Sequence, residues 1–115
     1  LLHDGQYYMY CTVENAEKLV DHNSFNTAIG KQDGYFVYQS EDLQSWENKG
    51  LCLRSEDVMG DKWFWAPEVL CRNGKFYMVY SAEEHIGMAV ADSPLGPFKQ
   101  EEKKWDYTKH ALGKY

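Results

Sequence analysis

The residues of this sequence best suited to chemistry are its aromatic rings and its carboxylates. Aromatic residues make up 16% of the 115 residues, with four Trp and nine Tyr. Flat rings of this kind stack on the C–H faces of sugars, although they also fill the cores of β-rich proteins. In the run Trp63-Phe64-Trp65, strand side chains would alternate between two faces, so at least one ring must pack internally. The composition permits a carbohydrate site and does not by itself distinguish it from packing.

The spacing of the potential ligand residues does not indicate a metal or cofactor site. The four His and three Cys form no H-x-x-x-H or C-x-x-C pair, which are spacings typical of zinc sites. A phosphate-binding Gly-rich loop and a nucleophile elbow are also missing from the sequence. We therefore expect no cofactor and no metal among these residues.

Charge and hydropathy limit the class of partner. The formal net charge is −6, which argues against binding to nucleic acid because phosphates are neutralised by Lys and Arg. No apolar run approaches the length of a membrane span, and no signal peptide is visible. We therefore expect neither a nucleic-acid partner nor a membrane partner. The opening residues Leu1 to Gly5 read as part of a hairpin, so an upstream signal could precede them.

The cysteines bear on the cellular compartment. Cys11, Cys52 and Cys71 are odd in number, and each stands in an apolar stretch. Buried free thiols are the expected state. Reduced thiols favour a cytoplasmic location.

A strand-rich unit that could hold such residues occurs twice. Residues 1–12 align with residues 70–81 at an offset of 69. Each copy carries a two-residue turn, Asp4-Gly5 or Asn73-Gly74. These dipeptides favour the type I′ turn of a β-hairpin. Residues 36–46 align with residues 88–98 at an offset of 52. Because this offset is smaller than 69, the first copy contains additional loop residues, within the polar stretch 14–33.

Each copy therefore predicts one sheet of four short antiparallel strands. Repeated four-stranded sheets are the sequence sign of a β-propeller, which needs at least four of them. Two sheets cannot close such a ring, so a face of each would stay open unless something covers it. The expected strands are 1–3, 6–13, 34–40 and 46–54 in the first copy and 68–72, 75–82, 85–92 and 97–102 in the second.

Four stretches, taken in order, give the sequence a resemblance to a known family. They are Tyr7-Tyr8-Met9-Tyr10, Ser40-Glu41-Asp42-Leu43-Gln44-Ser45-Trp46, Trp65-Ala66-Pro67-Glu68-Val69 and Asp92-Ser93-Pro94-Leu95-Gly96-Pro97-Phe98. The chain resembles the family 43 glycoside hydrolases, a group of arabinanases, α-L-arabinofuranosidases and β-xylosidases. The resemblance covers residues 1 to about 102.

The resemblance implies an all-β, five-bladed propeller that hydrolyses O-glycosidic bonds of arabinose- or xylose-containing plant glycans with inversion. Inversion needs one carboxylic acid to protonate the leaving oxygen and an opposing carboxylate to activate water. In the family the base precedes the position of Leu1, and the other two acids lie on later blades. We therefore expect a fragment of about two blades, inactive alone, with no catalytic residue among those present. A structural calcium ion in the intact parent is compatible with the resemblance.

The resemblance also points to the residues that could touch substrate. Glu68 opens the innermost strand of the second blade, where it could bond sugar hydroxyls or instead satisfy backbone donors between blades. Trp65, followed by Trp63, is the ring favoured to line a pocket, with packing as the alternative. Trp46 and Phe98 hold equivalent places in the repeat, which favours a structural role for both. Ser40, Asp42, Asp92 and Gly96 are interpreted as turn residues.

The organisation expected from these arguments is a partial propeller over residues 1–104, with blade one at 1–54 and blade two at 63–104. Residues 105–115 do not resemble a third blade and form a divergent tail. The expected partners are a carbohydrate and, because the ring is open, either a second copy or missing blades. The alternatives are a non-catalytic carbohydrate-binding propeller module and a propeller used only as an interaction scaffold.

Overall fold

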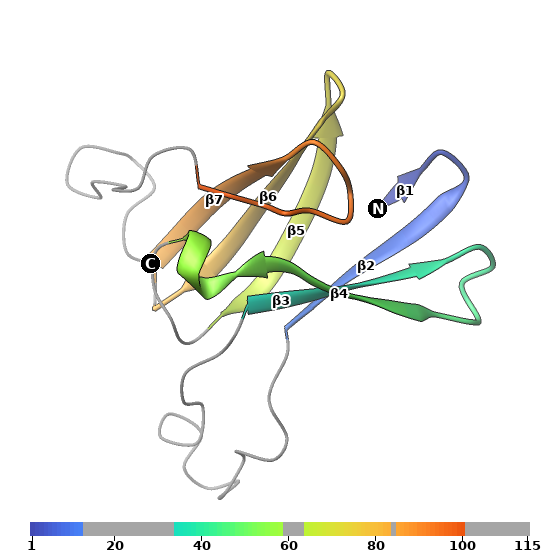
Figure 1. The fold of residues 1–115 in the computed structure, drawn as a ribbon, viewed down its shortest axis with the longest axis horizontal. Helices are drawn as coiled ribbons and strands as arrows, with labels where there is room; N and C mark the ends of the chain where they lie inside the picture. Colours follow the sequence, from blue (N-terminus) through green and yellow to red (C-terminus); the bar gives the residue numbers. More distant parts are fainter. Residues whose placement is uncertain (13–33, 59–63, 84, 101–115) are drawn as a thin grey trace, which may run out of the picture.

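Two antiparallel sheets make up the part of the chain that the computed structural model describes, residues 1–12, 34–58, 64–83 and 85–100. The first sheet has the order β1-β2-β3-β4 and the second the order β5-β6-β7 (Figure 1). A 3₁₀ turn, η2, follows β4. The elements are β1 (Leu2–His3), β2 (Gln6–Thr12), β3 (Gly34–Ser40), β4 (Glu47–Arg54), η2 (Ser55–Asp57), β5 (Trp65–Arg72), β6 (Lys75–Ala82) and β7 (His85–Ala91).

Both predicted hairpin turns are confirmed. Asp4 and Gly5 have φ values of 48° and 74°, and Asn73 and Gly74 have φ values of 53° and 75°. Two consecutive positive φ values are the mark of the type I′ turn, whose twist matches that of the flanking strands. The turns join β1 to β2 and β5 to β6, so the same unit begins each sheet.

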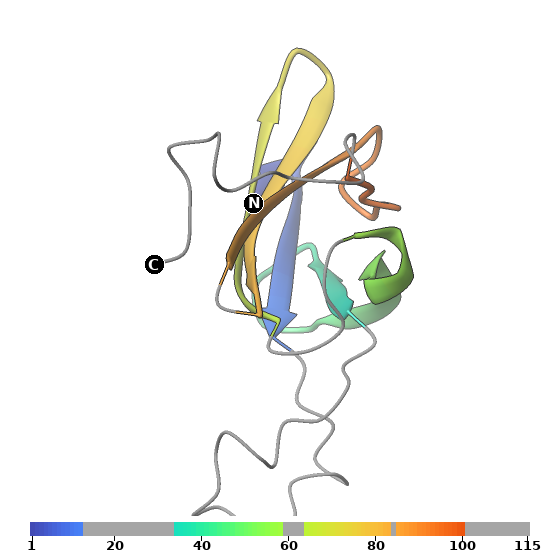
Figure 2. The same cartoon turned by 90° about the vertical axis from the view of Figure 1, so that its left-hand side faces the viewer.

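The fourth strand predicted for the second sheet, 97–102, is reduced to two bridging residues among those described. Phe98 donates its N–H to the carbonyl of Cys52 at 2.7 Å, and Lys99 exchanges hydrogen bonds of 2.9 and 3.0 Å with Val90. Neighbouring backbone groups of an extended segment point to opposite sides, so Phe98 pairs with the first sheet and Lys99 with the second. Pro97 has no N–H to give. Figure 2 shows this segment, in orange, on the same side of the molecule as η2, in green.

Strand pairing refines the repeat. Tyr7 pairs with Ser40 in the first sheet, and its counterpart Phe76 pairs with Ala91 in the second. The third strands are therefore related by an offset of 51 (Ser40 to Ala91), whereas the fourth segments keep the predicted 52 (Trp46 to Phe98). The predicted offset of 52 for the whole of 36–46 is thus wrong by one residue within β3. The second copy has one more residue in the loop that contains Gly96-Pro97.

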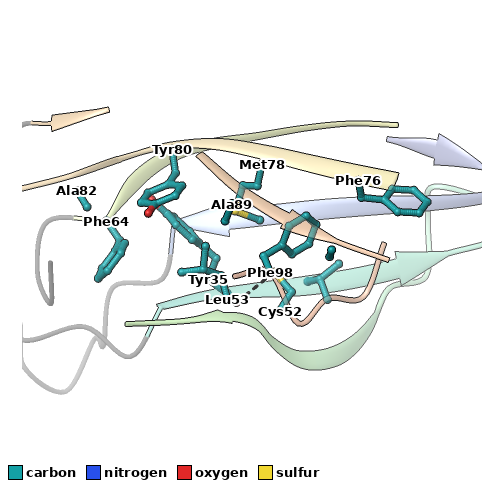
Figure 3. Close-up of a cluster of buried hydrophobic side chains, with 12 residues drawn as sticks. Tyr35, Cys52, Leu53, Phe64, Phe76, Met78, Tyr80, Ala82, Ala89 and Phe98 are labelled. Atoms are coloured by element: carbon teal, nitrogen blue, oxygen red, sulfur yellow. Dashed lines mark hydrogen bonds between the residues drawn. The ribbon is translucent and has the colours of Figure 1, made fainter. Parts of the chain in front are cut away.

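The core lies between the two sheets (Figure 3). Tyr35 contacts Phe64 and Tyr80 in edge-to-face and related geometries, with ring centroids 5.4 and 5.9 Å apart. Such aromatic pairs add to the free energy gained from burial. Leu53, which pairs with Tyr35, and Phe98 are also fully buried in this cluster. The remaining buried members are Val37, Cys52, Phe76, Met78, Ala82, Ala89 and Ala91.

Both sheets carry exposed apolar residues. Met9 on the first sheet is 40% exposed, and Leu70 and Val79 on the second are 50% and 40% exposed. These residues lie on the faces turned away from the core. No helix in the described ranges is long and apolar enough to cross a membrane.

The three cysteines are all free, as predicted, but only one is buried. Cys52 lies in the core and donates its thiol to the carbonyl of Tyr35 at 3.4 Å. Cys11 is half-buried, and burial raises the pKa of its thiol. The expectation of burial is wrong for Cys71, which is exposed. Cys71 stands on the edge strand β5, next to the Asn73-Gly74 turn.

Candidate functional site

A β-bulge shapes the start of β5, where the predicted site residues stand. Trp65 pairs with Ser81 and Glu68 pairs with Val79. An advance of three residues along β5 therefore lies opposite an advance of two residues along β6. The bulge contains Ala66, whose φ of 47° lies in the left-handed region, and Pro67, which has no ladder N–H to lose. A non-glycine residue in that region costs about 1–2 kcal/mol. Bulges of this kind re-aim side chains and occur frequently beside active sites.

The consequence of the bulge is that Trp65 and Glu68 share a face. In a regular strand, residues three apart point to opposite faces. Here their partners Ser81 and Val79 are two apart on β6 and therefore lie on one face, which places Trp65 and Glu68 on that face together. The structure brings these two predicted site residues to one side of the second sheet. Trp63 lies outside the described residues.

The environments of Trp65 and Glu68 differ. Trp65 is half-buried, whereas Glu68 is exposed. An exposed carboxylate is available to a ligand, and both interpretations of Glu68, bonds to sugar hydroxyls and bonds to backbone donors between blades, stay predictions. Phe64, the middle residue of the aromatic run, is fully buried between the sheets. This agrees with the expectation that at least one ring of the run packs internally.

Tyr35 is the residue at this site that sequence reasoning missed. Its hydroxyl, on β3 of the first sheet, lies 3.0 Å from the carbonyl oxygen of Trp65 and 3.0 Å from that of Ser81. One hydroxyl proton can be donated to either carbonyl. Tyr35 is fully buried and thereby ties the start of β5 to the first sheet. The only sequence signal was its place in an aromatic strand, which does not distinguish it from Phe36 or Tyr38.

Two open hollows occur at repeat-equivalent places, away from Trp65 and Glu68. One, of about 400 Å³, is lined by the loop that joins β3 to β4 and includes Trp46. The other, of about 380 Å³, is lined by the loop after β7 and includes Lys99. A feature that both copies of a repeat share is explained by the architecture of the blade. We therefore assign neither hollow to the substrate.

The loop beside the first hollow shows why its residues are structural. The Ser40 hydroxyl accepts the N–H groups of Asp42 and Leu43 at 3.2 and 2.9 Å. One oxygen of Asp42 accepts those of Gln44 and Ser45 at 2.8 and 2.9 Å. The bonds from Ser45 and Gln44, with that from Ser40, lower the pKa of the Asp42 carboxyl. These contacts confirm the turn role predicted for Ser40 and Asp42.

A metal centre finds no ligand set here. Within the ranges that the structure describes, no three or more His, Cys, Asp or Glu side chains gather closely enough to hold an ion. The structural calcium ion that the resemblance allows in the intact parent stays a prediction.

Comparison with known proteins places this fold in a family. The profile of the glycosyl hydrolases family 43 matches residues 1–111. A xylosidase/arabinosidase of Bacteroides ovatus is 32% identical over 103 residues, which cover 83% of this chain and 31% of the relative. The chain belongs to glycosyl hydrolase family 43, and its two sheets are blades of the family's five-bladed propeller.

Solved structures agree with this assignment. An endo-1,4-β-xylanase of Bacteroides thetaiotaomicron superimposes with a TM-score of 0.72 at 35% identity, over 92% of this chain and 33% of that one. An α-L-arabinofuranosidase of Clostridium thermocellum gives a TM-score of 0.70 at 28% identity, over 90% of this chain and 33% of that one. The chain thus spans about a third of the length of the relatives that it matches.

Proposed function

We propose that the chain forms part of the sugar-binding wall of a glycosidase that acts on xylose- or arabinose-containing glycans. The observation that carries the proposal is the family match over residues 1–111, together with the xylosidase/arabinosidase relative. Hydrolysis with inversion follows from the resemblance, in which the acid and the base belong to segments outside these residues. The described residues then contribute binding and positioning.

Trp65 and Glu68 are the proposed contacts. The half-buried Trp65 ring offers a flat apolar surface to the C–H face of a pentose, and the exposed Glu68 carboxylate offers an acceptor to its hydroxyls. The bulge at Ala66 and Pro67 sets both on one face. The Tyr35 hydroxyl fixes the backbone of Trp65 from the neighbouring sheet. Fixing a binding residue in advance lowers the entropy cost of binding.

Calorimetric titration with xylotriose and with an arabino-oligosaccharide tests this assignment. We expect Trp65→Ala to weaken binding by about 1 kcal/mol and Glu68→Gln to weaken it less. The matched control is Trp46→Ala, which removes the Trp beside the first hollow. Unchanged affinity in a normally folded Trp65→Ala variant would show that this ring only packs. Lost affinity in Trp46→Ala alone would move the site to the hollow.

A further inference from the structure

The glycine in β7 leaves its side-chain space to a tyrosine of the neighbouring strand. Gly87 is buried and pairs with Tyr80 on β6. A Cβ atom placed on Gly87 would lie 2.6 Å from the hydroxyl oxygen of Tyr80 and would also overlap the ring carbon that bears this oxygen. The φ value of Gly87 is not positive, so the backbone conformation does not require glycine here. Glycine inside a strand often marks such a close approach of another group.

The ring that occupies this space is enclosed by other rings. Tyr80 is 1% exposed and lies beside Tyr35 and Phe64, with ring centroids 5.9 and 6.2 Å away (Figure 3). Tyr35 and Phe64 contact each other edge to face at 5.4 Å. Because protein interiors are close-packed, displacement of one of the three rings displaces the others. A side chain on Gly87 would therefore disturb Tyr35.

Tyr80 is connected in two ways to the hydrogen bond that holds the start of β5. Its ring contacts the ring of Tyr35, whose hydroxyl lies 3.0 Å from the carbonyl oxygens of Trp65 and Ser81. Its backbone continues directly into Ser81, which pairs with Trp65. A shift of the Tyr80 ring away from β7 would change the position of the donor and of one acceptor. Gly87 is thus connected to the backbone of Trp65 through one ring and one hydroxyl.

The first sheet reverses the sizes of the two residues at the same place. Cys11 corresponds to Tyr80 at the offset of 69, and Phe36 corresponds to Gly87 at the offset of 51. Cys11 pairs with Phe36, as Tyr80 pairs with Gly87. Each pair combines one ring with one small residue, so the small residue accompanies the ring opposite it. In the second sheet this ring stands on the second strand, where it contacts Tyr35.

We propose that Gly87 is a positioning residue for the sugar site and acts through Tyr80 and Tyr35 on the backbone of Trp65. The absent side chain leaves the space in which the Tyr80 ring holds the Tyr35 hydroxyl against the two carbonyl groups. Gly87 is buried, so its effect on a sugar is indirect. The inference rests on the proposed function where it concerns sugar, whereas the route from Gly87 to Trp65 rests on the contacts alone.

One amide signal reports on this route without any ligand. Trp65-Ala66 is the one Trp-Ala pair in the sequence. A chain labelled with ¹³C at the Trp carbonyl and ¹⁵N at the Ala amide therefore gives a single cross-peak from that peptide bond. We expect Gly87→Ala to move this peak in the direction in which Tyr35→Phe moves it, because both variants weaken the hydrogen bond to the Trp65 carbonyl. In the Tyr35→Phe background, Gly87→Ala should move it no further.

The matched control is Ala89→Val, which crowds the same buried face of β7 beside Met78. It should lower the free energy of unfolding and leave the peak in place. Circular dichroism checks that each variant folds. If Gly87→Ala does not fold, Tyr80→Leu tests the same route, because it removes the ring from its place beside Tyr35 and should also move the peak. An unmoved peak in a folded variant of either residue, an equal movement in Ala89→Val, or an undiminished movement in the Tyr35→Phe background would overturn the proposal.

Calorimetric titration with xylotriose connects the route to sugar binding. We expect Gly87→Ala to raise the Kd at least about twofold, which is the lower end for substitutions that act on a site without touching its ligand. Ala89→Val should leave the Kd unchanged. If Trp65→Ala leaves the Kd unchanged while Gly87→Ala moves the peak, the proposed function fails and the route from Gly87 to Trp65 stands. If Trp65→Ala raises the Kd and a folded Gly87→Ala variant does not, the positioning role of Gly87 is overturned.

Discussion

The hydroxyl of Tyr35 on the first sheet lies 3.0 Å from the carbonyl oxygen of Trp65, the first residue of the second sheet. A buried residue of one blade thus holds the backbone at which the candidate sugar-binding ring of the next blade begins. Packing between blades and geometry of the site are therefore linked through a single side chain.

Removal of this hydroxyl should affect both properties. We expect Tyr35→Phe to lower the free energy of unfolding by about 1–2 kcal/mol, since a buried hydrogen bond is lost and a carbonyl is left with a poorer partner. Chemical denaturation followed by circular dichroism measures the change. Tyr38→Phe, on the opposite face of the same strand, is the control and should change stability less. Equal losses in the two variants would contradict the role assigned to Tyr35.

The approach of the loop after β7 to β4 should make Gly96 intolerant of a side chain. Its φ is +83°, and a Cβ atom there would meet the carbonyl of Cys52. Gly50 has a φ of +93° and open space around the same position. We expect Gly50→Ala to cost about 1–2 kcal/mol from backbone strain alone and Gly96→Ala to cost more. Thermal denaturation of the two variants gives the comparison, and equal costs would show that the loop moves away freely.

Stability should fall at alkaline pH because of a buried thiol. Burial raises the pKa of Cys52 to about 12, from 9.0. Below pH 9 the thiol is protonated in both states and the stability is intact. As the pH rises from about 9 to about 12, the unfolded chain releases the proton and the native chain keeps it, so stability is lost at up to about 1.4 kcal/mol per pH unit. Burial also raises the pKa of Tyr10, which adds a loss in the same direction at higher pH.

The measurement is the free energy of unfolding between pH 8 and 10.5 under reducing conditions. Cys52→Ala should give a shallower dependence above pH 9. Cys71→Ala, which removes the exposed thiol, is the matched control. A parallel curve for Cys52→Ala would show that another group is responsible.

The 115-residue chain alone should not turn over aryl α-arabinofuranosides or aryl β-xylosides. Inverting hydrolysis requires an acid and a base on opposite sides of one bond, and loss of either typically costs a factor of about 10²–10⁴. Glu68 is one carboxylate and cannot stand on both sides. Chromogenic assays on repurified protein check this expectation. Turnover that disappears in Glu68→Gln would mean that this chain holds a catalytic pair of its own.

The parts of the fold that could be predicted from the sequence are those fixed by local chemistry. Asp4-Gly5 and Asn73-Gly74 adopt the turn that their residue types favour, and the alternation along β6 buries Phe76 and Met78 on one face. The resemblance selected Trp65 and Glu68, but the predicted strand began at residue 68, whereas β5 begins at Trp65. No local pattern showed that a bulge would turn both to one face, because the bulge depends on pairing with Ser81 and Val79.

Equivalent positions in the two copies of the repeat differ in burial, so the repeat did not predict which of them is buried. Trp46 and Phe98 occupy corresponding positions, yet Phe98 is fully buried against the first sheet and Trp46 is half-buried beside an open hollow. The difference arises because Phe98 has a neighbouring sheet to pack on. Burial of a repeated residue depends on what stands next to its blade, and a single copy of the motif does not contain that information.

The pairing of Phe98 and Lys99 to different sheets makes two neighbouring amides independent reporters of motion. The N–H of Phe98 is held by the carbonyl of Cys52 in the first sheet, and the N–H of Lys99 by that of Val90 in the second. Deuterium uptake at Phe98 therefore follows separation of the two sheets, and uptake at Lys99 follows fraying of the outer edge of the second sheet. The difference in protection between adjacent positions measures how far the two blades open as one cooperative unit.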